Sequence, residues 1–551
     1  PVSNSEILDV TVIFSEPMNT GSAIVTAGME SPYDDITATM TGWSSTNCPD
    51  DPDYRDTWHG TLGGLVFLEG EMTLSIQAED VDNNGLMNPS STLAEWRYND
   101  THHDFTLESS GDSWTVTLHD YVNGSPVLSD LDDDGDLDVI VQCTDGYVHV
   151  LADDGSSWNE NWPMSSGGWG SINVKSCPSI VDLNGGGLDI LSVHACGCHA
   201  RDLSTGGNIS NWPVIMGGSE ALGFYPSMSS PVIGDVDSDG YPEMILCRHL
   251  SDSTILEPTV YLFEHTGGAW TWRRNLETGG SSVISTPAVG DVSSSHFGME
   301  IVVCTAEGYQ TDGDSESSKD YNSAVYLLDP DNGLDIVSPA YYNCWFWASP
   351  VVADIDDDGV NEIIVGTGIS GTSSRKVLVL NGNTLNEEHV WNVGSMVKHP
   401  VAIGDMNDDG ILDVVAVDNS GKVNCWYWSG DEYQSLPGFP VSIEGIPAAP
   451  SIVNIDGDIE LEIVVGTGDG YLYAINSDGS ICSGYPVSCG SGVFGQVAIG
   501  NIDDDNGLEM IFADDINPVL YCYDLGAGTF PAEMPWRQFQ HDSWHTGCID
   551  A

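Results

Sequence analysis

Short apolar runs separated by turn residues dominate the hydrophobic pattern of this chain. Two runs near the start, Leu8–Phe14 and Glu71–Gln77, alternate apolar and polar positions, as expected of β-strands with one solvated face. Turns rich in Gly, Ser and Thr lie between them, with few helical signals. From about residue 106 onward, short apolar strands alternate with acidic, glycine-containing turns in a repeating order. The pattern therefore predicts an all-β protein.

The repeating unit is clearest in its first copy. A strand at Ser125–Ser129 leads into an acidic loop, followed by strands at Leu137–Gln142 and Tyr147–Leu151 with a turn at Asp145-Gly146 between them. Successive acidic loops begin 47 to 63 residues apart, at Asp130, Asp182, Asp235, Asp291, Asp354, Asp405, Asn454 and Asn501. Roughly fifty residues and four short strands per unit are typical of a propeller blade. We predict an eight-bladed β-propeller over residues 106–551, with seven blades as the alternative, preceded by a small β-sandwich over residues 1–105.

The second position of every acidic loop is apolar. These residues are Leu131, Leu183, Val236, Val292, Ile355, Met406, Ile455 and Ile502. A solvated run of charges has no reason to keep an apolar position, so one side of each loop is predicted to be anchored in the blade core. The flanking carboxylates are then expected to converge on the other side.

The acidic loops have the spacing of a calcium site. Carboxylates at positions 1, 3, 5 and 9 surround a glycine that permits a tight turn, and position 7 offers a backbone carbonyl. Four intact loops are predicted to bind Ca²⁺ through Asp130, Asp132, Asp134, Asp136 and Asp138; Asp235, Asp237, Asp239, Tyr241 and Glu243; Asp354, Asp356, Asp358, Val360 and Glu362; and Asp405, Asn407, Asp409, Ile411 and Asp413. Two loops that begin with asparagine are weaker candidates, with Asn454, Asp456, Asp458 and Glu462, and with Asn501, Asp503, Asp505 and Glu509. The loops at Asp182 and Asp291 lack ligands and are expected to be ion-free turns, so about four to six structural Ca²⁺ ions are predicted.

The charge balance restricts the partners of the chain. Thirteen basic residues against 84 acidic ones give a formal net charge of −71 over 551 residues. Such a surface repels nucleic acid, anionic lipid and acidic polysaccharide. Bound calcium accounts for part of the excess, and a halophilic surface is an alternative cause of the remainder.

Several features favour an exported protein. The chain starts at Pro1, which suggests a removed leader, and no apolar stretch reaches the roughly 20 residues needed to span a bilayer. Millimolar calcium outside cells suits weak loops of this kind. An extracellular or cell-surface location is therefore expected. Among the 13 cysteines, Cys482 and Cys489 are close enough in sequence for a local disulfide.

The repeated loops resemble the calcium-binding repeats of the integrin α-chain propeller and of bacterial secreted proteins of the FG-GAP or VCBS type. This resemblance covers about four-fifths of the chain, residues 106–551. It implies that the calcium is structural, tying strand to strand within a blade. The runs Val12–Asn19 and Ala78–Met87 resemble bacterial Ig-like domains. The closing segment Pro535–Gly547 resembles a tail that often follows such propellers, and it is expected to pack on the last blade.

Catalysis finds little support in the sequence. No Ser-His-Asp or Gly-x-Ser-x-Gly arrangement stands out, no catalytic residue can be nominated, and only five lysines are present for a lyase acting on uronates. We therefore expect a non-catalytic surface, adhesion or structural protein that binds through propeller loops. A more specific form of this hypothesis is that copies of the protein assemble into filaments. The expected partners are other copies of the chain, or a cell-surface protein or glycan. The alternative is a secreted carbohydrate-active enzyme, a polysaccharide lyase or glycosidase, on the same scaffold.

Overall fold

The computed structural model of the chain consists, in the residues it describes, of short β-strands joined by turns. These are residues 113–549 except 133, 166–175, 184, 195–196, 211, 216–228, 248–258, 265–268, 275–280, 309–322, 369–374, 456–459, 490–491, 503–506 and 526–533, with the backbone of short strands before residue 97. No helix occurs in this part of the chain. The prediction of an all-β protein is confirmed.

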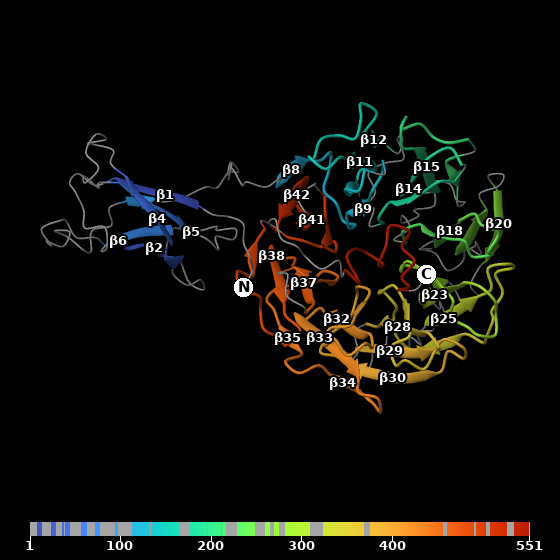
Figure 1. Cartoon of the computed structure of the whole chain (residues 1–551). Helices are drawn as coiled ribbons and strands as arrows, with labels where there is room; N and C mark the ends of the chain where they lie inside the picture. Colours follow the sequence, from blue (N-terminus) through green and yellow to red (C-terminus); the bar gives the residue numbers. More distant parts are fainter. Residues whose placement is uncertain are drawn as a thin grey trace, which may run out of the picture.

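Eight antiparallel sheets, the blades, are arranged around a central axis (Figure 1). Seven of them have four strands and the sixth has five, and the innermost strand of each is the one that precedes the acidic loop. Blade one contains β9 (Val127–Ser129), β10 (Asp138–Gln142), β11 (Tyr147–Leu151) and β12 (Met164–Ser165), and blade two contains β13 (Ser179–Val181), β14 (Asp189–His194), β15 (Gly197–Asp202) and β16 (Val214–Ile215). Blade three contains β17 (Val232–Gly234), β18 (Glu243–Cys247), β19 (Val260–Glu264) and β20 (Ala269–Arg274). Blade four contains β22 (Ala288–Gly290), β23 (Glu300–Cys304), β25 (Ser323–Leu328) and β26 (Ala340–Tyr342). A separate two-stranded ribbon pairs β21 (Ser281–Ser282) with β24 (Ala306–Gly308).

The last four blades repeat this order and close the ring. Blade five contains β27 (Val351–Ala353), β28 (Glu362–Gly366), β29 (Lys376–Asn381) and β30 (Glu387–Asn392). Blade six contains β31 (Ala402–Gly404), β32 (Asp413–Asp418), β33 (Lys422–Trp428) and β34 (Tyr433–Ser435), and β35 (Val441–Ser442) also pairs with β33. Blade seven contains β36 (Ser451–Val453), β37 (Glu462–Gly466), β38 (Tyr471–Ile475) and β39 (Val487–Ser488), and blade eight contains β40 (Ala498–Gly500), β41 (Glu509–Ala513), β42 (Val519–Asp524) and β8 (Trp114–Thr117). The outermost strand of blade eight, β8, precedes blade one in sequence. The prediction of eight blades rather than seven is confirmed.

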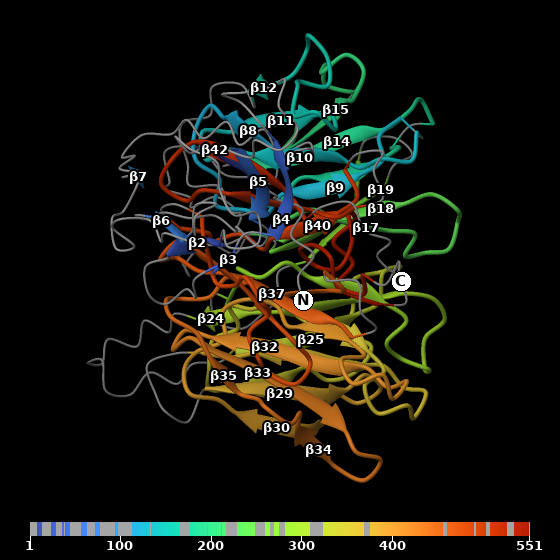
Figure 2. The same ribbon diagram turned by 60° about the vertical axis from the view of Figure 1, so that its left-hand side comes forward.

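The hydrophobic core lies between neighbouring blades, whose strands face one another in Figure 2. In blade five, Ile363 and Val365 pack with blade four, whereas Ile364 packs with blade six, and all three are fully buried. Because both faces of a blade are covered, the middle of its second strand is mostly apolar, as in Val139, Ile140 and Val141 of β10. This explains the continuous apolar runs of the sequence.

The C-terminal segment, residues 534–549, occupies the centre of the ring (Figure 1). It forms hydrogen bonds of 2.8–3.0 Å with the innermost strands of seven blades, at Leu128, Ser179, Ile233, Val289, Val352, Ile452 and Ile499. In the remaining blade, a Cβ added at Gly404 would meet Pro535 at 3.0 Å. The tail thus contacts the last blade at Ile499, and inner-strand amides of five other blades also find acceptors in it.

The strands before residue 97 form two small sheets. One has the order β1 (Leu8–Ile13), β5 (Thr57–Leu62), β4 (Thr39–Ser44), and the other the order β3 (Ile36–Thr37), β2 (Ile24–Gly28), β6 (Met72–Gln77), β7 (Ala94–Trp96). The predicted strands at Leu8–Phe14 and Glu71–Gln77 coincide with β1 and β6. The Ig-like assignment and the boundary near residue 105 stay predictions, since residues 97–112 lie outside the described part.

Candidate metal-binding loops

Each acidic loop connects the innermost strand of a blade to its second strand. The acidic residue that ends the loop is also the first residue of the second strand, as Glu362 is for β28. In all eight blades the carboxylate of this residue accepts a hydrogen bond of 2.5–3.2 Å from the amide of the apolar second position. The apolar side chain is buried in every loop. The predicted anchoring of one side of the loop in the core is therefore present.

The four intact loops share a second set of bonds. The first aspartate accepts a bond of 2.7–3.1 Å from the amide of the glycine at position 6, in the loops of Asp130, Asp235, Asp354 and Asp405. The aspartate at position 5 accepts one of 2.8–3.1 Å from the amide of position 7. The glycines have φ between +84° and +106°, a conformation that favours glycine. These bonds curl the loop so that its carboxylates turn toward one centre.

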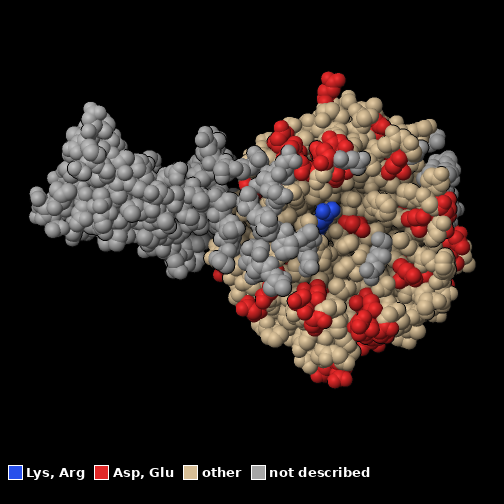
Figure 3. Space-filling view, in the orientation of Figure 1, with Lys and Arg blue, Asp and Glu red and all other residues tan. Residues whose placement is uncertain are grey.

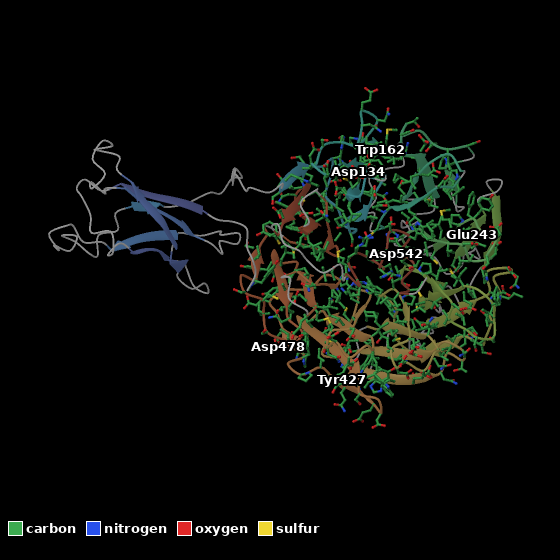
Figure 4. The ribbon with its side chains drawn as sticks, in the orientation of Figure 1. Asp134, Trp162, Glu243, Tyr427, Asp478 and Asp542 are labelled. Carbon is green, nitrogen blue, oxygen red and sulfur yellow. The ribbon has the colours of Figure 1, made fainter. Side chains whose placement is uncertain are left out.

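Three of the intact loops bring ligand atoms within 4.8 Å of one another. The groups are Asp130, Asp132 and Asp134; Asp235, Asp237 and Asp239; and Asp354, Asp356 and Glu362. In the fourth, Asn407 contributes an amide instead of a carboxylate. Figure 4 labels Asp134 and Glu243 in two different blades. The acidic side chains are spread around the ring on the face shown in Figure 3, where Lys or Arg atoms form one small spot near the centre.

Buried oxygen atoms in these loops have no hydrogen-bond partner among the described residues. They include Oε1 of Glu362, Oδ1 of Asp413, and Oδ1 of the first aspartates Asp130 and Asp235. Burial raises the pKa of Glu362 to about 9 and that of Asp413 to about 8, and neighbouring carboxylates add to both shifts. A bound cation would give these oxygens a partner and hold the carboxylates ionised. The donor set, which is oxygen only, fits a hard cation.

The loops at Asp182 and Asp291 are built differently. Asp182 folds back to accept the amides of Gly185 and Gly186, at 2.7 and 3.2 Å. In the loop at Asp291, Ser293 Oγ contacts Ser295 Oγ at 2.8 Å. Hydroxyl and amide groups thus stand in that loop where the intact loops have carboxylates, and the absence of calcium from it stays a prediction.

The two loops that begin with asparagine are only partly described. Asn454 is buried, and Glu462 and Glu509 accept the amides of Ile455 and Ile502 as in the other blades. The further candidate ligands Asp456, Asp458, Asp503 and Asp505 lie outside the described residues. Binding in these two loops therefore stays a prediction.

One group of candidate ligands was missed by sequence reasoning. His296 lies near Asp329 and Asp331, within 4.8 Å between ligand atoms. The two aspartates stand on the turn between β25 and β26, and a long insertion separates that turn from the loop of His296. The sequence signal that could have indicated these ligands was a pair of aspartates, Asp329 and Asp331, separated by one proline directly after an apolar strand.

The described cysteines are all buried, and none of them forms a disulfide. Cys482 and Cys489, considered above for a local bridge, are not bonded to each other, and Cys482 Sγ donates to Asn476 Oδ1 at 3.1 Å. Burial raises the pKa of Cys143 to about 12, so this thiol is not a reactive group near neutral pH.

Comparisons with known proteins support the architecture. No family model and no curated protein matches the chain. Quinohemoprotein alcohol dehydrogenase ADHIIG from Pseudomonas putida HK5 is 10% identical and aligns over 77% of this chain and 78% of its own, with a TM-score of 0.53. A europium-containing methanol dehydrogenase is 11% identical over 73% of this chain and 84% of its own, with a TM-score of 0.50. BamB from Moraxella catarrhalis is 15% identical over 75% and 96%, with a TM-score of 0.47.

At these identities the likeness shows the propeller fold alone. The expected non-catalytic adhesion or filament-forming role is contradicted, because the two propellers with TM-scores of 0.50 and 0.53 are both dehydrogenases and nothing in the comparisons indicates adhesion. That expectation rested on the resemblance of the repeats, and a scaffold shared by many functions does not determine one. The described part of the chain contains no apolar helix of membrane-spanning length.

Proposed function

We propose that this protein is a calcium-binding propeller of the FG-GAP or VCBS type, in which the ions stabilise the blades. The observation that carries the proposal is the acid at the end of each intact loop. Glu362, for example, binds the loop backbone through Oε2 at 3.1 Å and keeps Oε1 buried without a hydrogen bond. A cation held by Oε1 and by the first aspartates of the loop would join the innermost strand of a blade to the second.

Calcium suits these loops better than other divalent ions. The ligands are carboxylate, amide and backbone oxygens, which both Ca²⁺ and Mg²⁺ accept. Ca²⁺ tolerates the irregular and crowded geometry of a nine-residue loop, whereas Mg²⁺ demands near-octahedral geometry and gives up its water reluctantly. Loops with weak affinity would be filled at the calcium concentration outside cells, so we place the protein in the extracellular space or the cell envelope.

Titration calorimetry on the full chain, stripped of metal with a chelator, tests this proposal. The expected result is four to six Ca²⁺ bound per chain and an unfolding temperature that rises with Ca²⁺ and not with equal Mg²⁺. The variant Asp356→Asn should lose one equivalent, and the matched variant Asp431→Asn, on an exposed turn between β33 and β34, should lose none. An unfolding temperature that chelation leaves unchanged would refute structural calcium.

A second candidate function, a secreted carbohydrate-active enzyme, is favoured by an aromatic surface between blades four and five. The rings of Trp345 and Trp347 are half-buried and lie nearly parallel, with centroids 5.9 Å apart and an interplanar angle of 14°. Lys398 Nζ lies 5.5 Å from the centroid of Trp347. Paired indole faces offer the rigid apolar contact area on which sugar rings stack. Two of the similar propellers are enzymes, and this supports a catalytic function for the chain by analogy of fold alone.

Incubation of the calcium-loaded protein with neutral and uronate-containing polysaccharides tests this second function. A glycosidase releases new reducing ends, and a lyase also produces an ultraviolet-absorbing unsaturated uronate. The negative surface favours neutral glycans as substrates. Trp347→Ala should reduce binding, and Trp544→Ala, on the exposed part of the tail, serves as the control. Absence of both cleavage and binding across the panel would exclude this function.

A further inference from the structure

His296 stands between two carboxylates in blade four, one of the two blades whose acidic loops lack part of the predicted calcium ligand set. Its Nε2 lies 3.5 Å from Asp329 Oδ1, and its Nδ1 lies 3.3 Å from Glu300 Oε1. Asp331, two residues after Asp329, completes a group of three ligand atoms within 4.8 Å. The loop of His296 and the turn of Asp329 therefore place one imidazole and two aspartates around one point.

The spacing of these atoms fits a tetrahedral metal. Two ligands about 2.1 Å from a tetrahedral ion lie roughly 3.4 Å apart. The 3.5 Å between His296 Nε2 and Asp329 Oδ1 is close to that value and long for a charge-assisted hydrogen bond. Asp329 is held in place by the amide of Asp331 at 2.9 Å and by Asn332 Nδ2 at 2.7 Å. The aspartate is thus fixed before any ion arrives.

Glu300 supplies an independent indication of a metal ligand. Its side chain is fully buried, and Oε2 accepts the amides of Val292 and Ser293 at 2.6 and 3.0 Å. The polar neighbour of Oε1 is Nδ1 of His296, at 3.3 Å, and no other described group donates a hydrogen bond to it. A histidine that binds a metal through one nitrogen commonly donates the other N–H to a carboxylate, which fixes its orientation and tautomer.

From this arrangement we infer that blade four carries a binding site for a divalent transition-metal ion such as Zn²⁺. The ligands are His296 Nε2 and the carboxylates of Asp329 and Asp331, and Glu300 positions the imidazole. Imidazole nitrogen suits Zn²⁺ and related ions and is foreign to the oxygen-only calcium loops of the other blades. Three protein ligands leave a fourth position for water or another molecule. The site is therefore distinct in chemistry from the calcium loops.

Calorimetric titration of Zn²⁺ into the full-length protein, in excess Ca²⁺, tests the site. His296→Asn should lose one Zn²⁺ equivalent relative to the unchanged protein, and so should Asp331→Asn, whose exposed side chain makes the variant safe for folding. Glu300→Gln should keep the site and weaken it about 10- to 100-fold, as expected for a positioning residue. His389→Asn, which alters a histidine packed against Trp391 and Tyr433, is the matched control.

Co²⁺ offers a second readout, because a four-coordinate site gives visible absorption that six-coordinate Co²⁺ in water lacks. The band should be present in the unchanged protein and in His389→Asn, and absent in His296→Asn. Equal Zn²⁺ binding by His296→Asn and the unchanged protein would overturn the inference. So would a failure of the unchanged protein to bind Zn²⁺ at micromolar concentrations, which would leave a plain contact between histidine and carboxylates.

Discussion

The amide of Leu128 donates a 2.8 Å hydrogen bond to Oε1 of Gln538, a residue 410 positions later in the chain. Leu128 lies on the innermost strand of blade one, and Gln538 lies on the tail in the centre of the ring. The tail thus acts as a common partner for strands that are remote in sequence.

Substitution of Gln538 is expected to weaken the ring. Gln538→Ala leaves the buried amide of Leu128 without an acceptor, which costs about 1–3 kcal/mol. The midpoint of urea unfolding, followed by tryptophan fluorescence, measures this loss. Gln434→Ala, at the exposed outer strand of blade six, is the control and should change the midpoint little. Equal effects of the two substitutions would show that the tail does not stabilise the ring.

Glu362→Gln should act on stability through calcium. The amide keeps the size of the side chain but replaces an anionic ligand, so calcium affinity in this loop falls. At a calcium concentration of 100 times the dissociation constant, one bound ion contributes about 2.7 kcal/mol, and most of this would be lost.

Thermal unfolding with Ca²⁺ and with chelator checks this prediction. Glu362→Gln should unfold at a lower temperature than the unchanged protein in Ca²⁺ and at nearly the same temperature in chelator. Glu444→Gln, an exposed acid far from a loop of this kind, should behave like the unchanged protein in both. A large loss in chelator would instead indicate a role in packing.

His545 makes stability depend on pH. The imidazole is fully buried, Nδ1 contacts Ser179 Oγ at 2.9 Å, and burial lowers the pKa of His545 to about 4. Below about pH 6.5 the unfolded chain takes up a proton that the folded protein resists. The stability contributed by neutral His545 is therefore complete above about pH 6.5 and is lost as the pH falls toward 4.

The many carboxylates of the chain also make stability depend on pH. The difference in unfolding free energy between the unchanged protein and His545→Gln separates the contribution of His545 from theirs. The unchanged protein should lose up to about 1.4 kcal/mol per pH unit more than the variant between pH 6.5 and 4. Parallel pH profiles for the two proteins would contradict the prediction.

Strand β8 is expected to be essential for closing the ring. It forms the outer edge of blade eight, where Val116 pairs with Leu520 of β42. A chain of residues 113–551 should unfold near the temperature of the full chain. A chain of residues 119–551 exposes the edge of β42, so it should unfold several degrees lower and self-associate. Scanning calorimetry and light scattering distinguish these outcomes, and similar behaviour of the two chains would show that β8 is dispensable.

Local residue patterns were sufficient to predict the blades and the loops. The interval between acidic loops matched the length of a blade, and the apolar position after each first aspartate, such as Leu131, lies in the core as predicted. These features were readable because ligand, turn glycine and strand are adjacent in the chain. The adhesion role was wrong because it was drawn from the scaffold, and the scaffold is shared by proteins of different functions.

Contacts between distant segments could not be predicted in this way. The strand order within a blade and the acidic loops depend on spacing within about fifty residues, and the sequence by itself determines them. The choice of eight blades over seven needed the structure, in which β8 completes blade eight. Only the tertiary structure decides that the tail fills the centre of the ring and that His296 meets Asp329. The physical reason is that neither separation in the chain carries a periodic signal. The tail meets the innermost strands only when the ring closes, and His296 meets Asp329 only when β23 pairs with β25 across the long insertion between them.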